Sequence, residues 1–126
     1  MAETISEGFV KVLGVQDQTA DDGRATLTLD AEEDHLNPAG TVHGGVLATL
    51  VDTAMGHAVR SLSGEEDIPA TSQLSLTFLR PGKPGRLDVT ARVRKQGENL
   101  TICEAEVEQD DRTLVHAIAT FAVLHG

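Results

Sequence analysis

The chain has 126 residues, a length that suits one domain, and 40% of them are hydrophobic, enough for a core. Its formal net charge of −10 argues against nucleic acid as a partner, because binding to phosphates needs a basic face. The single cysteine, Cys103, excludes an intrachain disulfide and a multi-cysteine metal site. The N-terminal stretch MAETISEGFV has no secretory signature and no stretch reaches the roughly 18 apolar residues of a membrane span, so we expect a cytoplasmic protein without membrane contact.

The part of the chain before residue 37 predicts short elements only. Residues 1–8 are typical of a loose terminus or a short capping element, and residues 9–15 of a short strand. Residues 24–30, RATLTLD, alternate apolar and polar side chains, which predicts a strand of period two.

Residues 45–62 carry apolar side chains at helical spacing, which predicts one long amphipathic helix. Asp52 lies just outside the edge of this apolar stripe, and its neighbours one turn away, Ala48 and Gly56, are small. We therefore expect its carboxylate to sit in a gap on the helix surface. Gly56 costs about 1 kcal/mol relative to alanine inside a helix, which suggests close approach by another backbone, a subunit or a ligand.

Four further strands are predicted after the helix. Residues 73–79, 86–95 and 100–109 alternate apolar and polar side chains, whereas residues 113–124 are apolar on both faces and suit a central strand. Short turns, including the pair at 110–111, join them, which favours antiparallel neighbours. One helix on one face of an antiparallel sheet is an α+β fold.

The loop before the helix supplies the parts of an oxyanion site. Gly44 and Gly45 lie at the predicted helix N-terminus, where N–H groups lack partners and the helix dipole is positive. Asn37 offers a side-chain amide nearby, although an Asn-Pro pair is ordinarily a turn. The ordinary alternative for Asp52 is a surface acid that pairs with Arg60 or with nothing. Together, the loop and the helix supply oxyanion donors and a carboxylate within about two helical turns.

Other chemistries fit the sequence less well. It contains no G-x-S-x-G elbow and no glycine-rich phosphate loop ending in Lys-Ser or Lys-Thr. Asp52 and His57 are five residues apart and point about 140° apart on a helix, so with His43 they do not predict a metal site. His57 and His116 are interpreted as core or surface histidines, and Cys103 as a small buried hydrophobe.

Six of the ten lysines and arginines fall within residues 80–95: Arg80, Lys83, Arg86, Arg92, Arg94 and Lys95. Two interpretations remain open. The segment is either a strand with one solvated basic face or a local anion site for a small ligand that bears phosphate.

Three quoted stretches give the sequence a resemblance to a known family. HLNPAGTVHGGVLATLVDTAMGHAV, followed by SLTFLRPGK and RKQGENL, closely resembles the PaaI-type branch of the hotdog-fold acyl-CoA thioesterases, from about Asp30 to the end. The resemblance implies that residues 1–126 form a single hotdog thioesterase domain. In that fold, a long central helix is wrapped by an antiparallel sheet of five to six strands.

The resemblance also implies catalytic roles. Asp52 matches the catalytic acid, which acts as general base on water or as nucleophile. The backbone N–H of Gly44 matches the donor that polarises the thioester carbonyl. Asn37 matches the amide that orients the water or the thioester, with His43 beside it, and Thr71 falls where relatives hold the attacking water.

In such enzymes the site lies across a dimer interface, so the resemblance implies a homo-oligomer, a dimer with shared sites that pairs into a tetramer. No metal and no cofactor are implied. Arg80, Lys83 and Lys95 would meet the phosphates of coenzyme A. The full set of expected substrate-binding residues is Gly45, Ser72, Gln73, Phe78, Leu79, Arg80, Pro81, Gly82, Lys83, Lys95 and Gly97.

We therefore expect an enzyme, a thioester hydrolase that converts an acyl- or aryl-CoA thioester to free acid and coenzyme A. A thiol leaving group with a pKa near 8.5 departs as thiolate, so one base and one oxyanion site suffice. The alternative is a non-catalytic acyl-CoA-binding hotdog protein, which would not need Asp52. A hotdog dehydratase would need a His–acid arrangement that the sequence does not show.

Overall fold

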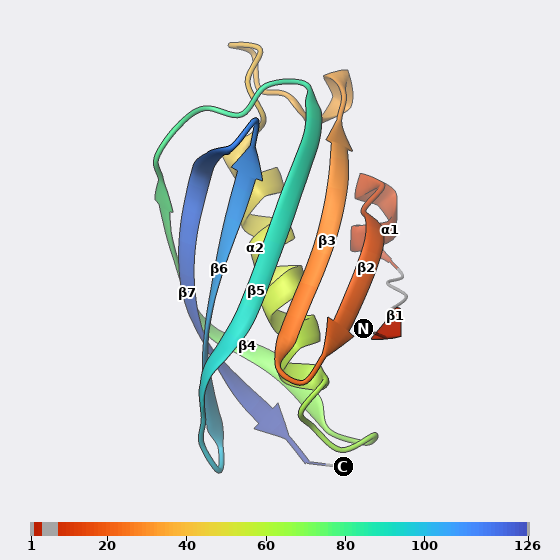
Figure 1. Ribbon diagram of the computed structural model, residues 1–126, viewed down its shortest axis with the longest axis vertical. Helices are drawn as coiled ribbons and strands as arrows, with labels where there is room; N and C mark the ends of the chain where they lie inside the picture. Colours follow the sequence, from red (N-terminus) through yellow and green to blue (C-terminus); the bar gives the residue numbers. More distant parts are fainter. Residues whose placement is uncertain (1, 4–7, 126) are drawn as a thin grey trace.

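The computed structural model describes residues 2–3 and 8–125, which form an antiparallel sheet and one long helix (Figure 1). The elements in chain order are β1 (Ala2–Glu3), α1 (Phe9–Leu13), β2 (Gln16–Asp21), β3 (Arg24–Ala31), the 3₁₀ helix η1 (Glu33–His35), α2 (Gly44–Arg60), β4 (Ile68–Phe78), β5 (Gly85–Gln96), β6 (Leu100–Gln109) and β7 (Arg112–Leu124).

Among the described residues, the sheet has seven strands in the order β1-β2-β3-β5-β6-β7-β4, and every pair is antiparallel. β1 has only two residues, so six strands form the body of the sheet. Figure 1 shows α2 lying along one face of this sheet. The α+β hotdog arrangement predicted from the sequence is confirmed.

The core lies between α2 and the sheet. The buried face of α2 consists of Leu47, Leu50, Val51, Ala54, Met55, Ala58 and Val59. These side chains pack against the inward residues of β3, β5, β6 and β7, and burial of each leucine or valine contributes about 1.5–3 kcal/mol. Cys103 belongs to this layer as predicted, and burial raises the pKa of its thiol to about 12.

The prediction of a strand at residues 9–15 is wrong. Phe9–Leu13 form the single helical turn α1, which ends at Gly14 with a left-handed φ of 86°. A short apolar run cannot be assigned to strand or helix by periodicity alone, and a left-handed glycine is a common helix terminator. The strand that follows, β2, was not predicted, because its sequence QDQTAD is polar and only Ala20 is buried. Of residues 1–8, only 2, 3 and 8 are described, so the rest of that expectation lies outside the described residues.

The predicted helix and the four strands after it are present, with shifted ends. The helix, predicted over 45–62, spans Gly44–Arg60, and the strand predicted over 73–79 is part of β4, Ile68–Phe78. β7 pairs with β6 on one side and β4 on the other, as expected of a central strand, and β4 forms an edge of the sheet. Within the described part of the chain, neither helix is long and apolar enough to cross a bilayer.

Candidate functional site

His43 organises the N-terminus of α2. Its Nδ1 accepts a hydrogen bond of 2.8 Å from the Gly45 N–H, and its carbonyl accepts from Val46 and Leu47. The neutral imidazole therefore carries its proton on Nε2. Of the four N–H groups in the first turn, only that of Gly44 donates to no described residue. The helix therefore offers one open donor at its positive end.

The two glycines after His43 have different reasons to be glycine. A Cβ at Gly45 would lie 3.0 Å from His43 Nδ1, so a larger residue would push the imidazole away from its hydrogen bond. A Cβ at Gly44 would make an ordinary contact of 3.5 Å with the Phe78 ring. Gly44 lines a hollow of about 250 Å³ together with the segment from Phe78 to Gly82, so its open N–H lies beside space that a ligand can enter.

Asn37 shapes the loop that leads into α2. Its Oδ1 accepts from the N–H groups of Ala39 and Thr41, and its Nδ2 donates to the Thr41 hydroxyl at 2.8 Å. The loop is joined to the 79–84 segment by the Val42 N–H, which donates to the Gly82 carbonyl at 2.9 Å. An amide has two N–H protons, so one proton of Asn37 has no acceptor among the described residues.

Asp52 and Thr71 meet as a pair. The Thr71 hydroxyl donates a hydrogen bond of 2.6 Å to Oδ1 of Asp52, which is half-buried on α2. Oδ2 accepts no hydrogen bond from a described residue, and the carboxylate forms no ion pair with Arg60. The ordinary alternative, a surface acid paired with Arg60, is therefore not what the structure contains.

A bulge in β4 explains how Thr71 reaches the helix. The register with β7 shifts between Thr71 and Gln73, which leaves Ser72 as the extra residue. Thr71 pairs with the inward-facing Phe121, and Leu74 also faces inward, although the two are three positions apart. Without the bulge they would face opposite sides of the sheet. Gln73, an expected substrate-binding residue, lies on the outer face.

Asp52 borders two adjoining hollows, as the small residues beside it predicted. The larger hollow has a volume of about 470 Å³, and Gly56 is one of the residues that line it. The smaller hollow has a volume of about 270 Å³, and Ala48 is one of its lining residues. A Cβ at Gly56 would meet only the Phe121 ring, at an ordinary 3.7 Å. The protomer itself therefore does not require a glycine at position 56, and the missing side chain serves to keep the larger hollow open.

His57 also lines the larger hollow, although the sequence gave no reason to place it near Asp52. Its Nε2 lies 2.8 Å from Gln18 Oε1, which can only accept, so Nε2 is the donor. Burial, and then the nearby Arg60, lower the pKa of His57, which keeps the imidazole neutral at pH 7. No three acidic, histidine or cysteine side chains among the described residues lie close enough to hold a metal ion.

Gly44 and Asp52 are too far apart to act together within one chain. They are eight residues apart on α2, which is about 12 Å along the helix axis. A reacting carbon must lie about 3–3.5 Å from the attacking atom, and its oxygen must be as close to the donor. A reacting carbonyl therefore could not be attacked by Asp52 and held by the Gly44 N–H of the same chain.

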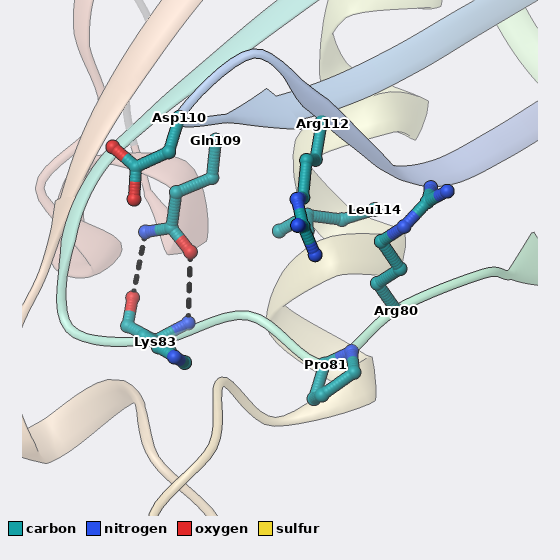
Figure 2. A pocket seen from close by; sticks show the side chains of 7 residues that line it. All are labelled: Arg80, Pro81, Lys83, Gln109, Asp110, Arg112 and Leu114. Atoms are coloured by element: carbon teal, nitrogen blue, oxygen red, sulfur yellow. Dashed lines mark hydrogen bonds between the residues drawn. The ribbon is translucent and has the colours of Figure 1, made fainter.

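A third hollow, of about 520 Å³, is bordered by three cations, Arg80, Lys83 and Arg112 (Figure 2). The buried Gln109 fixes its floor, because its amide accepts from the Lys83 N–H at 2.9 Å and donates to the Lys83 carbonyl at 2.8 Å. Arg80 donates to the Thr113 carbonyl. Arg112 was not predicted from the sequence to be among the cations of an anion site. Its position just after the 110–111 turn was the only feature of the sequence that could have suggested it.

The other arginines of the basic segment, residues 80–95, form ion pairs with acids. Arg92 bonds to Glu104 and Glu106, and these bonds hold the pKa of Glu106 below its usual range. Arg94 also pairs with Glu104, and Arg86 with Asp88. These three arginines are neutralised by partners, most of them on β6, which leaves Arg80, Lys83 and Lys95 without a described carboxylate partner.

Lys95 and Gly97, two expected substrate-binding residues, lie at the far end of β5. At about 3.3 Å per residue, they are roughly 30 Å or more from Lys83, so one protomer cannot bring them to the same phosphate. Gly97 closes the β5–β6 turn, where its N–H donates to the Leu100 carbonyl and a Cβ would collide with that oxygen. The structure thus gives Gly97 a role in the turn.

Comparison with known proteins identifies the family. The sequence model of the thioesterase superfamily matches residues 39–116. The chain belongs to this superfamily. It is 35% identical over 109 residues to acyl-coenzyme A thioesterase 13 of Homo sapiens, covering 84% of this chain and 76% of that protein. It is 33% identical over 111 residues to acyl-coenzyme A thioesterase PaaI of Escherichia coli, covering 86% and 77%.

Solved structures of the superfamily agree with the fold. The E. coli PaaI protein superposes with a TM-score of 0.84 at 32% identity, covering 93% of this chain and 84% of that one. A thioesterase family protein from Silicibacter pomeroyi superposes with a TM-score of 0.89 at 29% identity, covering 95% and 91%. The expected enzyme class, a thioester hydrolase, is confirmed. The matched range contains Gly44, Asp52, Thr71 and the three cations but begins after Asn37.

Proposed function

We propose that this protein hydrolyses an acyl- or aryl-CoA thioester to the free acid and coenzyme A. One observation carries the proposal: Asp52 is a half-buried carboxylate that Thr71 holds at 2.6 Å beside a hollow, on the long helix of a thioesterase-superfamily chain. Relatives named acyl-coenzyme A thioesterases support the substrate class.

Asp52 acts in one of two ways. As a general base, its free Oδ2 takes a proton from water while the water oxygen attacks the thioester carbonyl carbon. As a nucleophile, Oδ2 attacks that carbon itself, and water then cleaves the resulting anhydride. In both routes the carbon–sulfur bond breaks, coenzyme A leaves as thiolate, and the thiolate later takes up a proton. Thr71 occupies Oδ1 and so aims the other oxygen.

The oxyanion that forms on the carbonyl oxygen is held by the open Gly44 N–H of a second protomer. This donor lies at the positive end of a helix, where it stabilises developing negative charge. A second protomer is required because Gly44 and Asp52 of one chain are about 12 Å apart. Asn37, with one unused amide proton, orients the water or the thioester. The working unit is a homodimer with shared sites, and pairs of dimers form the tetramer.

The nucleotide end of coenzyme A binds at the hollow bordered by Arg80, Lys83 and Arg112. These cations are not neutralised by acids within hydrogen-bond distance, unlike Arg92 and Arg94. The segment from Phe78 to Gly82 joins this hollow to the one at Gly44. It provides a path for the pantetheine arm toward the reacting carbon.

The test is hydrolysis by Asp52→Ala, followed as thiol release from a panel of acyl- and aryl-CoA thioesters. We expect kcat to fall about 10²–10⁴-fold, while coenzyme A binding is unchanged. Asp88→Ala is the matched control, because Asp88 is an exposed acid on the outer face of β5. Undiminished turnover by Asp52→Ala would reject the mechanism. A wild-type protein that binds the thioesters without releasing thiol would support the acyl-CoA-binding alternative.

A further inference from the structure

The larger hollow beside Asp52 ends at a cation that has no partner. Arg60, the last residue of α2, lines this hollow. Its side chain is exposed, and it forms no ion pair or hydrogen bond with any described residue. Arg86, Arg92 and Arg94 have carboxylate partners, whereas Arg60 keeps its guanidinium open beside the hollow.

The chemistry of the hollow changes along its length. Asp52 is the only acid that lines it, and it lies about 12 Å along the helix axis from Arg60. Between these two charges the walls are mixed, with the apolar side chains of Ile68, Pro69 and Phe121 and the polar side chains of Thr53, Thr71 and His57. Burial lowers the pKa of His57, which stands next to Arg60, and Arg60 is the only lysine or arginine among the described residues that line the hollow.

This arrangement disfavours a plain hydrocarbon end. An alkyl or phenyl terminus would remove water from the guanidinium without replacing its hydrogen bonds, which costs free energy. A carboxylate terminus would instead form charge-assisted and potentially bidentate hydrogen bonds to it. No acid among the described residues forms an ion pair with Arg60, so its charge is left for such a terminus.

We propose that the preferred substrates are monothioesters of dicarboxylic acids, whose distal carboxylate is bound by Arg60 in the hollow that begins at Asp52. The proposal rests on the proposed thioesterase function and on the position of Asp52 at the reacting carbon. The apolar side chains of the walls hold the methylene chain, the missing side chain of Gly56 leaves room for it, and Arg60 determines specificity without taking part in bond cleavage.

The test compares adipoyl-CoA with hexanoyl-CoA, which have acyl chains of equal length and differ in the terminal carboxylate. We expect wild-type kcat/KM to be about tenfold higher for adipoyl-CoA, because charge-assisted hydrogen bonds between a carboxylate and a guanidinium are worth about that factor. Arg60→Ala should remove this preference by lowering the rate with adipoyl-CoA only, and Arg60→Lys should keep part of it. Arg24→Ala, which removes an exposed cation outside the hollow, should leave the ratio unchanged.

Two results separate this inference from the proposed function. If hexanoyl-CoA is hydrolysed but the ratio is near one, or Arg60→Ala leaves the ratio intact, the inference fails and the thioesterase function stands. If neither thioester is hydrolysed, the proposed thioesterase function fails for these two substrates. The proposed role of Arg60 is then tested by measuring how tightly the protein binds the two acyl groups. For that purpose, calorimetry with the non-hydrolysable thioether analogues of both substrates should show a Kd about tenfold lower for the carboxylate form. Equal Kd values, or a difference that Arg60→Ala leaves unchanged, would overturn the proposal.

Discussion

The orientation of the Asp52 carboxylate depends on one hydroxyl group. Thr71 donates to Oδ1 at 2.6 Å, which fixes the carboxylate and leaves Oδ2 open. The same division of work occurs at the other half of the site, where His43 occupies the Gly45 N–H and leaves that of Gly44 open. In both cases a neighbouring side chain takes one polar atom and so selects the atom that is left for substrate.

Thr71→Val tests this dependence at the residue scale. The substitution keeps the shape of the side chain and removes only its hydroxyl, so we expect kcat/KM to fall about tenfold to a hundredfold, in line with loss of a hydrogen bond to a charged group. Thiol release from the best substrate is the measurement. Thr53→Val is the control, because Thr53 lines both hollows beside Asp52 but makes no hydrogen bond to it. Equal losses in the two variants would show that the hydroxyl of Thr71 has no special role.

Single residues also show which features of the candidate site could be predicted from the sequence and which could not. The glycines at the helix N-terminus and the acid at position 52 were chosen from their types and spacing, and the structure places them where expected. The different roles of Gly44 and Gly45 could not be predicted, because they depend on the rotamer of His43. Arg60 was considered only as a partner for Asp52, since the lack of an ion pair with any described acid is a property of three-dimensional packing.

At the scale of elements, α2 combines a sealed face and an open one. Its buried residues pack on the sheet, whereas Ala48 and Gly56 on the other side leave the hollows beside Asp52. Gly56 weakens the helix, yet nothing within the protomer crowds that position. Glycine at position 56 therefore lowers the stability of the helix and leaves space beside the Asp52 carboxylate.

Gly56→Ala should separate stability from activity. We expect the free energy of unfolding to rise by up to about 1 kcal/mol, since alanine is the better helix former and the added methyl makes only an ordinary contact with Phe121. We expect kcat/KM to fall, because the methyl narrows the larger hollow. Thermal unfolding and thiol release measure the two effects. A variant that is more stable and fully active would mean that substrate does not enter this hollow.

Periodicity explains which elements could be predicted. α2 and the strands β3, β5, β6 and β7 are long and strongly patterned, so the sequence located them within a few residues. β2 is polar, α1 is a single turn, and the bulge in β4 depends on pairing with β7, so none of the three had a local signature. The ion pairs between β5 and β6 could have been predicted from the sequence, because the outward faces of these consecutive strands carry opposite charges.

At the scale of the whole molecule, the proposed mechanism takes Asp52 and the Gly44 N–H from different chains. Mixed dimers test this directly. Gly44→Pro removes the N–H, and adds a ring beside Phe78, at a helix position that tolerates proline, and His43 already has the extended backbone, φ −58° and ψ 134°, that a residue before proline requires. Asp52→Ala removes the other half. Each variant alone should lose at least about a hundredfold in kcat.

After the two variants are unfolded and refolded together in equal amounts, half of the dimers should contain one chain of each kind. Such a dimer has one intact site, so we expect about a quarter of wild-type activity to return. Mixing without refolding is the control and should restore little. If the refolded mixture stays as inactive as its components, the site is built within one chain.

The buried Gln109 fixes the length of the segment from Pro81 to Gly85. Surface loops ordinarily accept insertions, but one more residue here would pull Lys83 from both of its hydrogen bonds and shift the cations around the third hollow. The connection from Ser61 to Asp67 is also held, because the Ser61 hydroxyl accepts from the Gly23 N–H at 2.8 Å and the Leu62 carbonyl accepts from Gln96 of β5. A loop of residues 81–85 transplanted from this protein would therefore keep its shape only together with Gln109.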